Sequence, residues 1–144
     1  MIQKAEVKDL PVIAELACRL WPDNTAEEMC AEMEETLTKP DAAFFLAYVE
    51  DVPFGFAQCQ LRYDYVEGTE TSPVGYLEGI YVAQEHRKRG IARELLSACE
   101  NWAKTKGCTE FASDCELDNA QSLQFHLNVG FEEANRIICF TKKI

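Results

Sequence analysis

A basic turn with a glycine, set inside a strongly acidic chain, constrains the fold more than any other stretch. Residues 87–90, Arg-Lys-Arg-Gly, lie between a strand-like run at 74–82 and a periodic helix that begins at Ile91. The first N–H groups of a helix lack partners within the helix and carry the positive end of its dipole, so an anion is favoured there. Gly90 lets the backbone approach a bulky phosphate. The sequence therefore predicts a strand, a phosphate-binding turn and a helix in succession.

The chain as a whole carries the opposite charge. Its 144 residues include 25 acidic and 14 basic ones, a formal net charge of −11 at pH 7. Such a charge argues against a nucleic-acid partner and suits a cationic one. Acids gather between Asp23 and Asp41, where Lys39 is the only base. Clustering of this kind leaves two interpretations open, a binding face for a cation and a solvated surface.

Length and composition predict one domain, covering residues 1–144. No apolar run has the length needed to cross a bilayer, and Glu6 and Asp9 stand where a signal peptide is apolar, so we expect a cytoplasmic protein. The seven cysteines are odd in number and include no closely spaced pair. They are therefore expected to be free thiols, mostly buried, and no metal site is predicted.

Hydrophobic periodicity and turn signals predict ten elements. Strands are expected at 2–7, 43–49, 54–66, 74–82, 109–114 and 136–142, and helices at 10–20, 25–37, 91–104 and 119–129. Asp9, Thr25 with Glu28, and Asp118 are the expected helix caps. The order β-α-α-β-β-β-α-β-α-β predicts an α/β (α+β) fold, with a mixed, mostly antiparallel central sheet flanked by about four helices.

Two motifs in this order carry a resemblance to a known superfamily. Residues 87–92 match the Arg/Gln-x-x-Gly-x-Gly/Ala signature of the GCN5-related N-acetyltransferases, and they sit between a strand and a helix as that signature requires. A second motif follows at residues 119–131, from Asn119 through His126 to Phe131. A solvated basic turn is the alternative for the first motif alone, and the second motif weighs against it.

The resemblance extends to one family of that superfamily, the bacterial aminoglycoside 6′-N-acetyltransferases. It covers nearly the whole chain and is most specific over residues 63–82. It implies an enzyme that transfers an acetyl group from acetyl-CoA to the 6′-amino group of aminoglycoside antibiotics, conferring resistance. It also implies a homodimer, for which the strand at 137–140 would supply a shared edge.

The same resemblance assigns the cofactor contacts to the strand, the turn and one later residue. They are Ile80, Tyr81, Val82, Arg87, Lys88, Arg89, Gly90, Ile91, Ala92 and Asn119. Buried strand is the alternative for the first three, and a helix cap is the alternative for Asn119. Within this resemblance, the strand and helix around the turn, together with Asn119, narrow the expected anion to the pyrophosphate of coenzyme A.

The resemblance places substrate contacts at Trp21, Tyr65, Glu78 and Asp114. Carboxylates and aromatic faces are the groups that hold a polycation such as an aminoglycoside. Core packing is the alternative for the two aromatic residues, and a surface acid or a turn former is the alternative for the two acids. Asn135 falls where relatives carry an acid, so one charge contact of the substrate site is expected to be absent.

An ammonium has no lone pair, so the substrate amine must lose a proton before it attacks a thioester. Glu78 and Asp114 are the expected acceptors of that proton, directly or through water. His126 stands where the superfamily often has a Tyr that protonates the leaving thiolate, and this departure leaves the general acid open. No cysteine nucleophile is needed.

Two other functions remain open from the sequence. One is acetylation of a different small polyamine or of a peptide amine, which an acidic substrate side suits equally well. The other is a non-catalytic acidic module that binds the cofactor or a basic partner. The intact turn and Asn119 argue against the second alternative.

Overall fold

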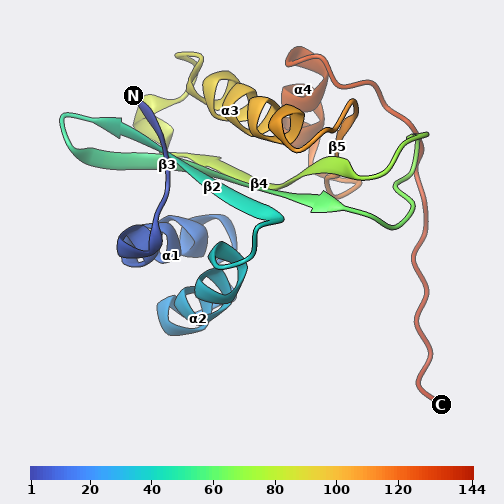
Figure 1. Cartoon of the computed structure of the whole chain (residues 1–144), viewed down its shortest axis with the longest axis horizontal. Coiled ribbons are helices and arrows are strands. Elements are labelled where there is room, and N and C mark those ends of the chain that lie inside the picture. Colours follow the sequence, from blue (N-terminus) through green and yellow to red (C-terminus); the bar gives the residue numbers. More distant parts are fainter.

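Five strands form one sheet with helices on both of its faces, and the computed structural model describes all 144 residues (Figure 1). The strands follow the chain in order: β1 (Ile2–Lys4), β2 (Ala42–Val49), β3 (Val52–Arg62), β4 (Val74–Val82) and β5 (Phe111–Ser113). The first four are antiparallel and β5 joins β4 in parallel, which confirms the mixed, mostly antiparallel sheet.

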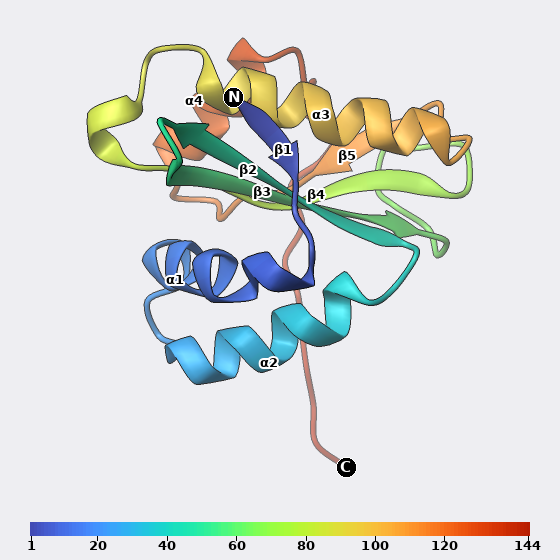
Figure 2. The same cartoon turned by 60° about the vertical axis from the view of Figure 1, so that its left-hand side comes forward.

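Helices α1 (Leu10–Leu20) and α2 (Ala26–Leu37) cover one face of the sheet, while α3 (Ile91–Thr105) and α4 (Ala120–Asn128) lie on the other (Figure 2). Short 3-10 turns, η1 (Val7–Asp9) and η2 (Gln84–His86), precede α1 and α3. The expected capping box at α2 is confirmed, because the backbone N–H groups of Glu28 and Thr25 donate to each other's side chains.

The sheet separates two apolar cores because successive side chains of a strand point to opposite faces. Phe44, Leu46 and Phe56 pack beneath α1 and α2. Their neighbours in sequence pack beneath α3, where Leu95 and Trp102 close the second core. Both faces of the central strands are therefore buried.

Two expectations for the second half of the chain were wrong, and a third was confirmed over a shorter range. Asn119, not Asp118, caps α4, since its Oδ1 accepts from the Ser122 N–H at 3.0 Å. The strand expected at 109–114 is confined to Phe111–Ser113. The strand expected at 136–142 does not form: residues 131–144 have no regular secondary structure, and the chain leaves the body (Figure 1). A strand needs a partner edge, and this segment pairs with neither of the sheet's open edges, β1 and β5.

Asp9 precedes α1 as expected, but its side chain accepts from the Glu6 N–H in η1 rather than capping α1. All seven cysteines are free, and three of them are buried. No helix combines the length and apolar character that a membrane span requires, and no group of His, Cys, Asp and Glu side chains is gathered for a metal ion.

Two irregularities of β4 shape the region beside it. Gln58 of β3 pairs with Gly79 and Cys59 pairs with Leu77, so Glu78 is an extra residue in a β-bulge. On its other side, β4 pairs with β5 only from Gly75 to Leu77. The stretch of β4 from the bulge to Val82 therefore has no strand partner on that side.

Candidate active site

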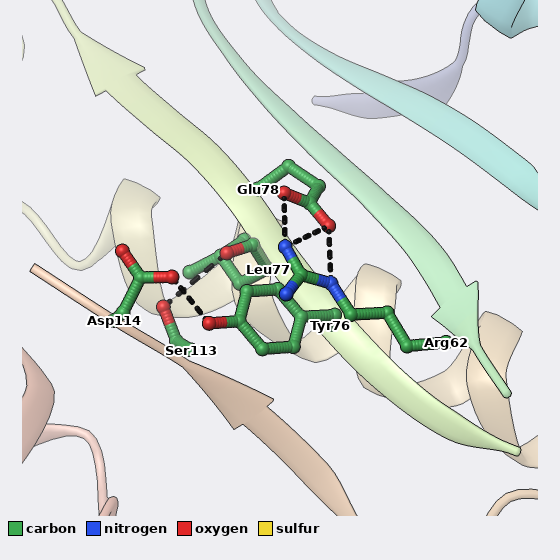
Figure 3. Close-up of polar contacts among 6 residues, drawn as sticks. All are labelled: Arg62, Tyr76, Leu77, Glu78, Ser113 and Asp114. Atoms are coloured by element: carbon green, nitrogen blue, oxygen red, sulfur yellow. Dashed lines mark hydrogen bonds and ion pairs between the residues drawn. The ribbon is translucent and has the colours of Figure 1, made fainter. Parts of the chain in front are cut away.

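The bulged residue Glu78 is held by an arginine from the neighbouring strand. Arg62 ends β3, and its Nε and Nη2 donate to the Glu78 carboxylate at 2.9–3.0 Å (Figure 3). The Glu78 side chain is 19% exposed. Burial raises the pKa of this carboxyl, and the hydrogen bonds from Arg62 oppose the rise. Glu78, the residue expected to accept the proton, is therefore a half-buried carboxylate that is already paired with the Arg62 guanidinium.

The same guanidinium lies flat on an aromatic ring. Arg62 Cζ is 3.4 Å from the centroid of the Tyr76 ring, and the Tyr76 hydroxyl donates to Asp114 directly after β5 (Figure 3). Burial and the bond to Asp114 raise the pKa of Tyr76, so the hydroxyl stays protonated at neutral pH. Arg62, Tyr76, Glu78 and Asp114, from three neighbouring strands, form one continuous set of contacts, which we call the acceptor network.

Asp114 differs from Glu78 in its surroundings. It is exposed, and its one partner is the neutral Tyr76 hydroxyl. No cation of the chain pairs with it, whereas Glu78 carries the Arg62 guanidinium. Asp114 is therefore the carboxylate of the network whose charge remains available to a ligand.

His126 lies against Ser113, the residue before Asp114, and both of its ring nitrogens have partners. Nδ1 is 2.7 Å from the carbonyl oxygen of Ser122, which only accepts, so Nδ1 carries a proton. In the neutral ring Nε2 then accepts, and it lies 2.8 Å from Ser113 Oγ. Ser113 Oγ also faces the Leu77 carbonyl at 3.3 Å (Figure 3). Proton donation from His126 Nε2 therefore requires the imidazolium form.

Of the aromatic residues assigned to substrate, one lies beside the network and one lies apart. The Trp21 ring covers Gly79, where an added Cβ would come within 2.6 Å of it, and meets Phe56 edge-on at 6.1 Å. Trp21 thus contacts the core and also lies beside the bulge. Tyr65 is 77% exposed in the loop between β3 and β4.

Asn135 also stays apart from the network. Its Nδ2 donates to Glu67 in the β3–β4 loop at 3.0 Å, and its Oδ1 accepts from the Arg136 N–H. The neighbouring Ala134 packs on Gly68. The C-terminal segment is therefore attached to the loop that carries Tyr65 before it leaves the body.

The basic turn has an open backbone rather than a packed one. Lys88 and Gly90 have φ angles of 62° and 82°, and α3 begins after Gly90 without a side-chain cap. A Cβ on Gly90 would meet nothing within 4 Å, so only the positive φ requires glycine there. Arg87, Lys88 and Arg89 are exposed. This open turn at the start of α3 has the geometry that an anionic group needs.

The Arg87 side chain makes a hydrogen bond that the sequence did not indicate. Its Nε donates to the Val82 carbonyl at 2.7 Å, at the end of β4. Ile80 and Tyr81, before it, are half-buried on the stretch without a partner on the β5 side. Both side chains pack against the apolar cores, and the backbone of this stretch has no strand partner beyond the short β4–β5 pairing.

Sequence reasoning missed Arg62 and Tyr76 as members of this site, and also Gln60, whose side chain interacts with Glu78 and lowers its pKa. Gln58, on the same strand, is 8% exposed, pairs with Gly79, and has an Oε1 without a hydrogen-bond partner. Polar residues at alternate positions of β3, at 58, 60 and 62, were the available signal, since alternate residues share a face.

The sequence is similar to those of several known proteins. Residues 10–131 match the sequence model of a family described as "Acetyltransferase (GNAT) family". The chain is 43% identical over 143 residues to an aminoglycoside N(6′)-acetyltransferase type 1 from Acinetobacter haemolyticus, covering 99% of this chain and 98% of that protein. A similar protein from Serratia marcescens is 42% identical and covers 90% of this chain and 89% of its own.

Solved structures agree as well. AAC(6′)-Iy in complex with the bisubstrate analogue CoA-S-monomethyl-acetylneamine superimposes with a TM-score of 0.95 at 38% identity, covering 100% of this chain and 98% of that chain. AAC(6′)-IG from Acinetobacter haemolyticus gives a TM-score of 0.95 at 41% identity, with 100% and 99% covered. Both the sheet with its helices and the sequence thus match the same group of proteins.

Proposed function

The chain belongs to the acetyltransferase (GNAT) family, and we propose that it transfers the acetyl group of acetyl-CoA to the 6′-amino group of aminoglycosides. The observation that carries this proposal is the pairing of a basic, open turn with an acidic network across β4 and β5. The names of the relatives, and a bisubstrate analogue in one of them that joins CoA to an aminoglycoside fragment, support the substrate class.

The donor side would be held by the turn and by the unpaired stretch of β4. The N–H groups at the start of α3, with Arg87, Lys88 and Arg89, suit a pyrophosphate. Ile80, Tyr81 and Val82 would offer backbone groups to the pantetheine arm, apart from the Val82 carbonyl, which already accepts from Arg87. Asn119 would contact the cofactor besides capping α4. The uncapped start of α3 supports this fit, since no capping side chain accepts from its first N–H groups. Acetyl-CoA supplies the acetyl group as an activated thioester.

On the acceptor side, Glu78 and Asp114 would orient the amine and accept its proton. Burial raises the pKa of Glu78, which makes this carboxylate a stronger base than an exposed one. Asp114 retains a charge that no cation of the chain neutralises, so it suits the ammonium groups of a polycation. Trp21 would add a substrate contact beside the bulge. Tyr65 and Asn135, which lie apart from the network, would contact only a substrate that extends to the β3–β4 loop.

His126 remains a candidate general acid toward the leaving thiolate. Its Nε2 has a proton to give only as imidazolium, because Nδ1–H is directed at the Ser122 carbonyl. His126→Phe tests this role. Loss of the alkaline limb of the pH–rate profile would support it, and an unchanged profile would remove His126 from the mechanism.

We further propose that the enzyme acts in the cytoplasm, confers resistance and is a homodimer. The C-terminal segment supports the dimer: Ile138 and Phe140 are 81% and 87% exposed on a chain that has left the body. A second copy would cover them and provide the partner strand that 137–140 lacks. Light scattering at micromolar concentration should give twice the chain mass of 16.3 kDa.

Two charge substitutions test that interface. Phe140→Asp should yield a monomer, whereas Val52→Asp, at an exposed apolar position of the β2–β3 hairpin, should leave the mass unchanged. A monomeric wild type would end the dimer proposal without affecting the catalytic one.

The catalytic proposal is tested by thiol release from acetyl-CoA across a panel of amines. Aminoglycosides with a 6′-amine should release thiol, and those with a 6′-hydroxyl should not. Faster release with spermidine or a basic peptide than with any aminoglycoside would favour a different acceptor amine. Absence of release with every amine would overturn the proposal and leave a binding module.

A further inference from the structure

A cation of the chain lies against the carboxylate that the proposed reaction uses as a base. Arg62 contributes two nitrogens to Glu78, and its guanidinium covers the Tyr76 ring. A site meant for a polycation has no obvious use for a cation of its own. Arg62 therefore needs a role of its own in the reaction, and that role rests on the proposed function.

Two contacts fix the Arg62 guanidinium, and a third holds one of its partners. Its edge binds both oxygens of Glu78, its face lies on Tyr76, and Tyr76 is anchored by its hydroxyl on Asp114 (Figure 3). The Arg62 side chain is 38% exposed, so it is partly withdrawn from water. A planar fork between a carboxylate and an aromatic face is a preorganised arrangement that lysine does not reproduce.

Arg62 is also the only cation that faces Glu78. Asp114 faces it from the end of β5, and this negative charge and burial both disfavour a charged Glu78. Tyr76 on β4 is neutral, and Trp21 at the end of α1 carries no charge. Without Arg62, Glu78 would have burial and a like charge against its ionised form, with no opposite charge to offset them.

We propose that Arg62 is a positioning residue, which holds the Glu78 carboxylate ionised and aimed so that it accepts the proton of the substrate amine. Tyr76 and Asp114 hold Arg62 in turn. The alternative is that Arg62 fills the substrate's cation subsite and leaves it on binding. The bidentate and stacked contacts weigh against this alternative, because all of them would have to break at once.

A double-mutant cycle tests the proposal with Arg62→Met, Glu78→Gln and the double variant. Arg62→Met should lower kcat/KM for an aminoglycoside about 10- to 100-fold and leave the KM for acetyl-CoA unchanged. In the Glu78→Gln background, the same change should add no more than about twofold. Arg62→Lys should restore part of the activity, because it returns the charge without the fork.

The pH dependence of kcat/KM distinguishes this role from a purely structural one, which would leave that dependence unchanged. Glu78 must be ionised to accept a proton, so kcat/KM falls as pH drops through the pKa of Glu78. Arg62→Met removes the stronger of the two side-chain interactions that lower this pKa and leaves the one with Gln60, so the acidic limb should move to higher pH. Carboxyl-carbon NMR of the unliganded protein should record the same rise in the pKa of Glu78.

Lys39→Met is the matched control, since it removes one positive charge and an exposed ion pair with Glu35. It should change neither the pH profile nor the Glu78 resonance. Thermal unfolding of each variant checks the fold, and Arg62→Lys keeps the test valid if Arg62→Met unfolds.

Two outcomes would overturn the role of Arg62. A lower substrate KM in Arg62→Met would mean that the arginine blocks the cation subsite. An equal loss in wild-type and Glu78→Gln backgrounds would mean that it does not act through Glu78. If the wild type acetylates no amine, the proposed function fails, while the NMR titration still decides whether Arg62 controls Glu78.

Discussion

The acceptor network and the basic turn are constructed in opposite ways. In the network, side chains from three strands hold one another, with Arg62 on Glu78 and Tyr76 on Asp114. In the turn, the backbone has positive φ angles at Lys88 and Gly90, and the basic side chains are exposed, with Arg87 bonded only to the Val82 carbonyl. The network therefore depends on individual side chains, while the turn depends on backbone angles.

This difference has a consequence for catalysis. A preorganised set of side chains aims a charge with little rearrangement when the substrate arrives, which favours the chemical step. A set of free N–H groups with exposed cations holds an anion without reacting with it. We therefore expect changes in the network to act on the acceptor amine and changes in the turn to act on acetyl-CoA.

The largest effect is expected from Asp114→Asn. Its carboxylate is the member of the network that no cation neutralises, and asparagine can still accept from Tyr76. Loss of one charge-assisted contact lowers kcat/KM for aminoglycosides about 10- to 100-fold. The KM for acetyl-CoA should not change. Steady-state kinetics with each substrate varied in turn measures both.

Asp118→Asn is the control for this charge. Asp118 is exposed in the same segment after β5, and its carboxylate belongs to neither the network nor the α4 cap. Equal losses of kcat/KM in the two variants would mean that the overall negative charge of the protein, rather than the position of Asp114, holds the substrate.

The same contrast explains which parts of the molecule could be predicted from the sequence. The strand at 74–82 was confirmed at both ends, and the helix expected at 91–104 was confirmed as Ile91–Thr105. Their signals are local: an apolar run, a glycine in the turn and a helical period. Local signals alone were therefore enough to place the turn between them correctly.

The acceptor network was found only in part because its contacts join separate strands. Glu78 and Asp114 were selected singly, but the register of β3 against β4 and the bulge at Glu78 bring Arg62 onto them. A shift of one residue would turn these side chains to the other face, and no local pattern sets that shift. The prediction of a strand at 136–142 was wrong for a related reason. An apolar run favours a strand but does not say which edge it pairs with, and no strand of the chain pairs with this segment.

An intermediate effect is expected from Gly90→Ala in the turn. Alanine at a φ of 82° costs about 1–2 kcal/mol. If the backbone relaxes to relieve this strain, the N–H groups that face the anion move with it. The KM for acetyl-CoA should rise about tenfold, the size of one lost charged contact, and the acceptor KM should stay unchanged.

Gly107→Ala is the matched control at the other end of α3. Gly107 has a φ of 88° and, like Gly90, open space where a Cβ would lie. Both variants should lose similar thermal stability, and only Gly90→Ala should weaken acetyl-CoA. A higher KM for acetyl-CoA in both would assign the effect to α3 stability instead of the turn.

The smallest effect is expected from Tyr76→Phe, which separates the ring from its hydroxyl. The ring still supports Arg62, but Asp114 loses its donor, and water replaces it because Asp114 is exposed. We expect kcat/KM for the aminoglycoside to fall about two- to tenfold, within the range of a single hydrogen bond. Tyr63→Phe is the control, since this tyrosine also donates to a carboxylate, Asp41, at 3.2 Å. A loss from Tyr76→Phe as large as that from Asp114→Asn would mean that the hydroxyl itself takes part in the reaction, and the network would then be more than a scaffold for two carboxylates.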